Sequence, residues 1–159
     1  MIFVATGTQK FPLDRLLRTV DVLIEKGVIT EEVFAQTGSS TYQPRHYGFT
    51  PFMGKEEFDE KVERSDLLIT HSGVGTIISG MQRGKGIIVY PRLAKYGEHV
   101  DDHQLQIAKA FSGQGYVLLC AEEDDLGEKI SEAKHRSFAV YRSQREQVLG
   151  TVRDFLEAL

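Results

Sequence analysis

The stretch Leu67-Leu68-Ile69-Thr70-His71-Ser72-Gly73-Val74-Gly75-Thr76-Ile77-Ile78 decides the fold class of this chain. An apolar run suited to a buried strand passes through a His/Ser/Gly turn directly into a helical pattern. The first backbone N–H groups of such a helix have no partner within it, and they lie at the positive end of the helix dipole. The stretch therefore predicts a phosphate site in an α/β sheet, against the simpler interpretation of a plain glycine turn.

The rest of the chain alternates between strand-like and helix-like patterns. Strands are predicted at residues 2–6, 32–37, 66–70, 86–90 and 116–120, with a weaker extended piece at 47–52. Helices are predicted at residues 12–24, 55–64, 75–83, 100–111 and 124–135, followed by a connector and a C-terminal helix at about 144–158. This order predicts a Rossmann-like α/β fold, with an open, mainly parallel sheet and helices on both of its faces.

Size and composition favour a single domain over residues 1–159. The net charge of −4, without a stripe of Lys or Arg, argues against a nucleic-acid partner. No apolar run approaches the ~20 residues that cross a bilayer, and Met1–Ala5 resembles a first strand rather than a signal peptide. The lone cysteine, Cys120, excludes an internal disulfide and is expected to be a buried, inert thiol. These features predict a cytoplasmic protein.

The turns after two of the strands supply the first candidate ligand contacts. Glycine lets the backbone approach a ligand closely because it has no Cβ, and threonine adds a hydroxyl donor. The candidates are His71, Ser72, Gly73, Gly75 and Thr76, together with Gly7 and Thr8 after the first strand. A turn glycine with a helix-capping threonine is the competing interpretation of the last two. No Walker A lysine follows, and the first turn lacks G-x-G-x-x-G, which argues against a dinucleotide cofactor.

A second polar cluster, residues 91–104, follows the next strand. Because the carboxyl ends of parallel strands share one edge of the sheet, both clusters are expected to face one cleft, as for a nucleotide and the group that it carries. Arg92 and Lys95 suit a diphosphate, or they are ordinary loop charges. Asp102 and Gln104 suit the vicinal hydroxyls of a sugar, although acidic residues here also suit the start of a helix.

Two histidines in this cluster have the spacing of a zinc site. His99 and His103 stand at i and i+4, which places them on one face of a helix. No third ligand is indicated, and the pattern is not H-E-x-x-H. We therefore predict no metal site.

Three runs of this sequence resemble the glycosyltransferase family 28 C-terminal domain. They are Thr-His-Ser-Gly-Val-Gly-Thr-Ile (70–77), Gly-Lys-Gly-Ile-Ile-Val-Tyr-Pro-Arg (84–92) and Glu-His-Val-Asp-Asp-His-Gln (98–104), and the resemblance covers nearly the whole chain. In character the chain is similar to the small catalytic subunits of two-part bacterial glycosyltransferases of exopolysaccharide and capsule assembly. It also resembles the eukaryotic subunit that adds the second N-acetylglucosamine to a dolichol-linked sugar.

The resemblance implies the donor-binding half of an inverting GT-B glycosyltransferase, with a UDP-sugar as substrate and neither cofactor nor metal. The phosphates would lie over the turn at Gly73, Gly75 and Thr76. Ribose and sugar would face residues 98–104. The contacts implied in and beside that segment are Arg92, Glu98, Asp102, His103 and Gln104, and the candidate bases are His71, Glu98 and His99, unless a partner supplies the base. Ser79 stands where single-chain members carry a ribose-binding Glu, so that contact would fall to Glu98 or Asp102.

A complete enzyme of this class needs a second domain for the acceptor. We therefore expect a heteromer with a membrane-anchored partner, which transfers sugar to a lipid-linked saccharide at the inner face of the membrane. The C-terminal helix around Phe155 would dock on the partner or pack on its own sheet. A non-catalytic nucleotide-sugar-binding module that regulates a partner is the alternative, while a UDP-sugar epimerase would need both domains in one chain. The sequence does not identify the sugar.

Overall fold

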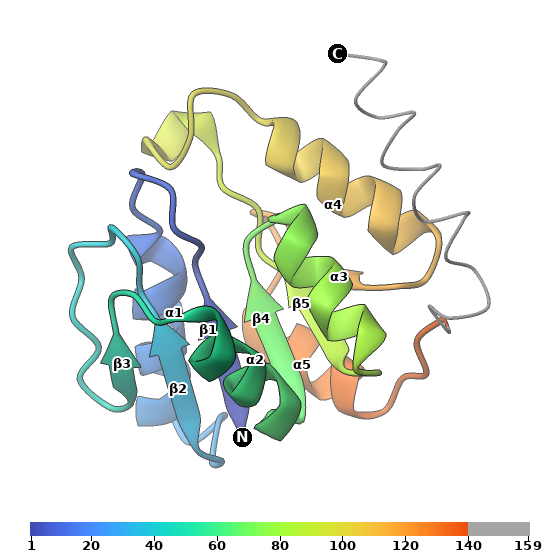
Figure 1. Cartoon of the computed structure of the whole chain (residues 1–159), viewed down its shortest axis with the longest axis horizontal. Coiled ribbons are helices and arrows are strands. Elements are labelled where there is room, and N and C mark those ends of the chain that lie inside the picture. Colours follow the sequence, from blue (N-terminus) through green and yellow to red (C-terminus); the bar gives the residue numbers. More distant parts are fainter. Residues whose placement is uncertain (140–159) are drawn as a thin grey trace.

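The computed structural model describes residues 1–139, which form a six-stranded sheet covered by helices on both faces (Figure 1). Every pair of neighbouring strands is parallel, in the order β3-β2-β1-β4-β5-β6. The strands are β1 (Ile2–Ala5), β2 (Val33–Gln36), β3 (Gly48–Thr50), β4 (Leu67–Thr70), β5 (Gly86–Val89) and β6 (Leu118–Leu119). The helical elements are α1 (Asp14–Glu25), α2 (Lys55–Arg64), α3 (Val74–Gln82), the 3-10 turn η1 (Ala94–Tyr96), α4 (His103–Gly113) and α5 (Leu126–Lys134). The predicted fold class is confirmed.

The core lies in two layers, one on each side of the sheet. Because successive side chains of a strand point to opposite faces, Ile2 and Val4 of β1 pack toward α1 and α5, whereas Phe3 and Ala5 pack toward α2, α3 and α4. Figure 1 shows α2 and α3 in front of the sheet and α1 and α5 behind it. Covering both faces explains why the central strands are apolar at every position.

The centre of the sheet holds the point at which the chain changes face. β1 and β4 are neighbours, yet β1 leads to α1 on one face and β4 leads to α3 on the other. In doubly wound sheets a crevice opens outside the carboxyl ends of two such strands, and ligands bind there. In Figure 1 the loop after β1 and the segment with η1 both rise at this edge of the sheet.

Most predicted bounds differ from the structure by a few residues, but the start of α4 was placed wrongly. The predicted helix 100–111 begins only at His103, and Val100, ahead of the helix, is 74% exposed. Residues 94–102 instead form a closed loop, because the backbone N–H of Ala94 donates to Asp102 Oδ1 (2.8 Å). The interpretation of His99 and His103 as i, i+4 neighbours on a helix is therefore wrong, since His99 precedes the helix.

Three further sequence predictions concern the C-terminal helix, a membrane span and Cys120. The expected C-terminal helix at 144–158 lies outside the described residues. Within residues 1–139, none of the helices has the length and apolar character that crossing a membrane would need. Cys120 is buried as predicted, and burial raises the pKa of its thiol to about 12.

Candidate functional site

The turn between β4 and α3 leaves the start of α3 open. Gly73 is the N-cap residue, and no side chain caps the helix. The first backbone bond into the helix runs from Ile77 N to Gly73 O (3.0 Å). The N–H groups of Val74, Gly75 and Thr76 precede that bond, so they are the donors that a helix cannot satisfy itself. They stand at the positive end of the α3 dipole, where an anion is favoured.

A pocket of about 260 Å³ lies at this turn and at the carboxyl end of β1. It brings together six of the predicted contacts with four residues that had not been singled out. Its lining comprises Gly7, Thr8, His71, Gly73, Gly75 and Thr76 from the prediction, with Gln9, Gln36, Met53 and Phe58 in addition. The loop after β1 and the β4–α3 turn therefore form one concave site, as their positions at neighbouring strand ends require.

The His71 ring packs against both glycine loops of the pocket. A Cβ on Gly7 would lie 2.4 Å from His71 Nε2, and a Cβ on Gly73 would lie 2.6 Å from the same atom, so neither position accepts a larger residue without displacing the ring. Gly7 also has a φ of +84°, which a side chain rarely adopts. Burial lowers the pKa of His71 to about 3, and the nearby Arg92 charge acts in the same direction. The imidazole is therefore neutral at physiological pH.

Gln36 fixes the loop after β1, and sequence reasoning had missed it. Its Oε1 accepts from Gly7 N (3.1 Å), while its Nε2 donates to Gly7 O (2.9 Å) and to Pro51 O (2.8 Å). Gln36 is only 2% exposed. A polar residue at the carboxyl end of a buried strand was the available signal, because such a side chain needs partners at the cleft edge.

Gln104 lies behind the pocket rather than on its lining. Its Oε1 accepts from Ser72 N (3.3 Å) and Arg92 N (3.1 Å), and its Nε2 lies 3.2 Å from His71 Nδ1. Ser72 is buried beside it, and the Ser72 hydroxyl has no hydrogen-bond partner among the described residues. Gln104 thus joins the turn after β4 to the segment after β5.

Arg92 is buried against backbone carbonyls. Its guanidinium donates to Phe11 O (2.8 Å), Pro12 O (3.1 Å) and Glu98 O (3.3 Å), and also to Thr6 O. Burial lowers its pKa to about 10, so it keeps its charge at neutral pH. Arg92 is 1% exposed and braces the loop that carries Gly7. The sequence had instead suggested that its side chain would be available to bind a diphosphate, or would be an ordinary loop charge.

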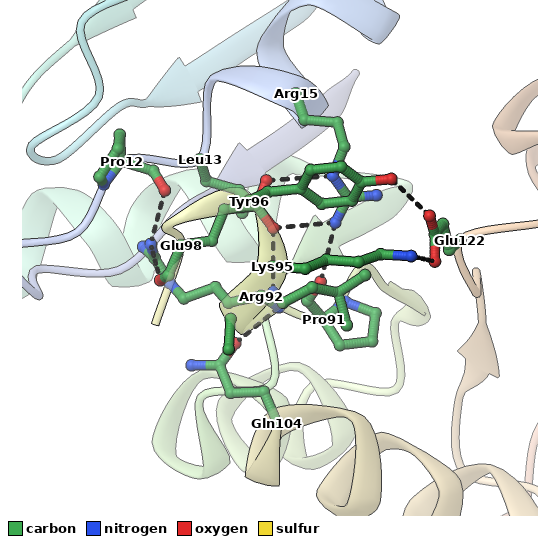
Figure 2. Close-up of polar contacts among 12 residues, drawn as sticks. Pro12, Leu13, Arg15, Pro91, Arg92, Lys95, Tyr96, Glu98, Gln104 and Glu122 are labelled. Atoms are coloured by element: carbon green, nitrogen blue, oxygen red, sulfur yellow. Dashed lines mark hydrogen bonds and ion pairs between the residues drawn. The ribbon is translucent and has the colours of Figure 1, made fainter. Parts of the chain in front are cut away.

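Glu98 is buried and forms an ion pair with the partly exposed Arg15 of α1 (Figure 2). Arg15 donates to both carboxylate oxygens (3.0 and 2.9 Å), and Leu93 N donates to one of them (3.0 Å). Burial lowers the pKa of Arg15, but Glu98 outweighs it, and the pKa is raised. In this arrangement protein donors hold both oxygens of the Glu98 carboxylate, and the residue is only 3% exposed.

The segment 91–98 is also attached to the residues after β6. Lys95 and Tyr96 both contact the carboxylate of Glu122, beyond β6 (Figure 2). The segment 91–98 is therefore held from both sides, by α1 and by the residues after β6.

The remaining candidates lie on the rim formed by the start of α4. His99 Nδ1 and His103 Nδ1 each lie 3.2 Å from an oxygen of Asp101, and the His99 ring contacts the Phe11 ring (centroids 5.4 Å apart). Asp102 closes the loop through Ala94 N (2.8 Å). Residues 1–139 hold no group of three His, Cys, Asp or Glu side chains arranged for a metal ion. This rim thus holds imidazole and carboxylate groups, none of which is part of the pocket lining.

Ser79, which the resemblance sets at the place of a ribose-binding Glu, is paired within its own helix. Its hydroxyl accepts from Arg83 Nη1 (2.9 Å) one turn later.

Comparison with known proteins agrees with the arrangement of the fold. Residues 1–159 match the family model described as "Glycosyltransferase family 28 C-terminal domain". Over 125 residues the chain is 25% identical to the UDP-N-acetylglucosamine transferase subunit ALG13 of Mus musculus, a match that covers 74% of this chain and 10% of that protein. To the Saccharomyces cerevisiae subunit of that name it is 40% identical over 57 residues, 36% of this chain and 26% of the relative. The chain thus spans about a tenth of the mouse relative's length.

Two solved structures share the fold. The solution structure of ALG13 superposes with a TM-score of 0.59 and 19% identity, covering 92% of this chain and 94% of that one. The crystal structure of Acinetobacter baumannii MurG superposes with a TM-score of 0.57 and 17% identity, covering 85% of this chain and 41% of that one.

Proposed function

The chain belongs to the glycosyltransferase family 28 C-terminal domains, and from this premise we propose that it is the UDP-sugar-binding subunit of a two-part glycosyltransferase. The names of its relatives make UDP-N-acetylglucosamine the first donor to test. The acceptor would be a lipid-linked saccharide, presented by a membrane-anchored partner at the inner face of the membrane. The observation that carries the proposal is the pocket at the carboxyl ends of β1 and β4, which the uncapped start of α3 adjoins.

The diphosphate would lie across the β4–α3 turn. The N–H groups of Val74, Gly75 and Thr76 and the α3 dipole would stabilise its negative charge, while Gly7 and Thr8 would approach from the opposite side. This charge grows on the departing UDP as the glycosidic bond breaks. Donors that are already oriented stabilise it without reorganising, and this is the main way in which such a site accelerates transfer.

Among the three candidate bases, His71 and Glu98 have environments that oppose the role. A pKa of about 3 leaves His71 with little tendency to accept a proton, and the oxygens of Glu98 are occupied by Arg15 and Leu93. His99 on the rim remains the candidate of this chain, with the partner as the other source. We therefore propose that His71 contacts the diphosphate and that His99 or the partner deprotonates the acceptor hydroxyl in an inverting transfer.

The test is titration calorimetry of the purified chain with UDP and with ADP. Tight binding of UDP is expected, and Gly75→Leu should abolish it. A Cβ on Gly75 meets no heavy atom within 4 Å, so we expect the variant to fold normally. The leucine side chain would then project beside the phosphate position. Gly113→Leu is the matched control: Gly113, in the last turn of α4, also has open space around it and lies outside the pocket lining. A folded wild-type chain that gives no heat with UDP would refute the proposed function.

A further inference from the structure

The side-chain amide of Gln104 has only one orientation that satisfies its neighbours. Its Oε1 lies 3.3 Å from Ser72 N and 3.1 Å from Arg92 N, and both are backbone N–H groups. A backbone N–H can only donate, so the atom facing the two must be the acceptor oxygen. Flipping the amide would set an NH₂ group against two donors in a site where Gln104 is 5% exposed. The backbone therefore fixes which end of the amide faces His71.

The orientation of Gln104 in turn determines the tautomer of His71. The amide NH₂ is only a donor, and it lies 3.2 Å from His71 Nδ1, which must therefore be the acceptor. A neutral imidazole that accepts at Nδ1 carries its proton at Nε2. We infer that Gln104 is a positioning residue that holds His71 as the Nε2–H tautomer and so presents a neutral hydrogen-bond donor to the pocket.

Two observations place this donor at the pocket. His71 is part of the pocket lining, and its Nε2 is the ring atom nearest to the Cβ positions of Gly7 and among the two nearest to that of Gly73. A donor at this point suits an oxygen of a diphosphate bound over the β4–α3 turn. The identity of that ligand rests on the proposed function, whereas the tautomer does not.

The charged groups around the ring keep it neutral. Burial is the main cause that lowers the pKa of His71, and the charges of Arg92, after β5, and of His99, ahead of α4, act in the same direction. The NH₂ group of Gln104 favours the neutral ring as well, because protonation of Nδ1 would set two donors against each other. The donor therefore remains unchanged across the neutral pH range, where an ordinary histidine would gain or lose a charge.

The direct test is a two-dimensional ¹H–¹⁵N spectrum of the histidine side chains in the ligand-free chain. His71, assigned by its absence from His71→Gln, should show the pattern of the Nε2–H tautomer, unchanged between about pH 6 and pH 8. A pattern of the Nδ1–H tautomer, of the imidazolium or of a mixture would overturn the inference.

The variant Gln104→Glu tests whether Gln104 is the cause. A carboxylate at this position still accepts from Ser72 N and Arg92 N, but its second oxygen now faces His71 Nδ1 and needs a donor there. The ring should therefore switch to Nδ1–H near pH 8 and take a second proton as the pH falls toward 6. Gln106→Glu adds the same charge at an exposed position of α4, and it should keep the wild-type spectrum.

Binding gives a readout that a merely structural role would not produce. UDP-N-acetylglucosamine is the probe, because its diphosphate does not titrate near neutral pH. At pH 8 the ring of Gln104→Glu has no proton at Nε2, so this variant should bind at least about tenfold more weakly than wild type. Binding should recover as the pH falls and Nε2 gains its proton. Wild type and Gln106→Glu should show no such recovery. An unswitched ring in folded Gln104→Glu would overturn the inference. Should the wild type show Nε2–H yet bind no UDP, the proposed function fails and the tautomer stands.

Discussion

At the scale of single residues, the polar side chains nearest the site are mostly buried, and they hydrogen-bond to the backbone of neighbouring loops. Gln36 holds Gly7, Arg92 holds the carbonyls of Thr6, Phe11 and Pro12, and Gln104 holds the turn after β4. Buried polar groups cost free energy unless they are paired, so these contacts also fix the geometry of the loops that carry them. The pocket is therefore preformed by residues that do not line it, apart from Gln36.

Burial of His71 predicts that acid destabilises the chain before its carboxylates titrate. The imidazole pKa is about 6.5 in the unfolded chain and about 3 in the folded one. Below pH 6.5 the unfolded state therefore binds more protons, and stability is lost as the pH falls from 6.5 toward 3. Urea unfolding should give a free energy about 2 kcal/mol lower at pH 5 than at pH 8 from this residue alone.

The control for this acid effect separates His71 from the other histidines. His71→Gln should lack the loss between pH 8 and pH 5, whereas His135→Gln, which changes an exposed histidine, should keep it. An equal pH dependence in wild type and His71→Gln would contradict the assignment.

At the scale of elements, α1 organises the long loop between β2 and β3. Asp14 accepts from Thr41 N (2.8 Å) and Tyr42 N (2.9 Å), and Asp21 accepts from Arg45 N (2.8 Å) and from two further donors. Asp21 is 4% exposed although it lies on a helix. One helix thus fixes the path of a segment that has little regular structure of its own.

Asp21→Asn should loosen this loop while leaving the sheet intact. The amide retains one acceptor, but its NH₂ group faces donors, so the loop loses backbone hydrogen bonds, at a cost of about 2 kcal/mol. Amide hydrogen exchange should speed up across residues 41–47 and remain unchanged in β1 and β4. Tyr42→Phe, which removes only the hydroxyl donor to Asp21, should have a smaller effect. Equal exchange in the loop of both variants and of the wild type would show that Asp21 does not hold it.

The sequence predicted best what is local. Helix α2 has the predicted bounds, Lys55–Arg64, and the β4–α3 turn was found because strand, glycines and helix follow one another within a dozen residues. The roles of Arg92 and Glu98 were not predictable in this way. Their partners Thr6 and Arg15 lie 86 and 83 residues away in sequence, and only the fold brings them together. A charged residue in a loop looks the same in sequence whether it binds a ligand or braces the backbone.

The start of α4 was misplaced for a related reason. Val100 fits an apolar helical stripe in sequence, but a hydrogen bond between Ala94 and Asp102 closes the loop around it. Long-range closure of this kind overrides local periodicity. The tautomer of His71 is a stronger case, since it depends on Ser72, Arg92 and Gln104 at three separate places in the chain.

At the scale of the whole molecule, the site lies at the carboxyl edge of the sheet, where the chain continues to one face after β1 and to the other face after β4. α1 and α3 leave the neighbouring strands β1 and β4 on opposite sides, so the pocket is open beyond the strand ends. In the proposed transfer, an acceptor hydroxyl would reach the sugar from that open side. Ahead of and at the start of α4, the Nδ1 atoms of His99 and His103 each lie 3.2 Å from an oxygen of Asp101. The proposed transfer would therefore need a second surface that orients the acceptor and excludes water.

This predicts that binding and transfer separate when the chain is purified alone. The chain should bind UDP-N-acetylglucosamine but move little radiolabelled sugar to polyprenyl-linked saccharides extracted from membranes. Membranes that contain a co-expressed membrane-anchored subunit should restore transfer by several orders of magnitude, since orientation alone contributes about 7–11 kcal/mol in favourable cases. Gly75→Leu added to the same membranes should remain inactive, because the defect lies in donor binding. Rapid transfer by the chain without membranes would mean that these residues already hold the acceptor, and the two-subunit proposal would have to be abandoned while the UDP site remained.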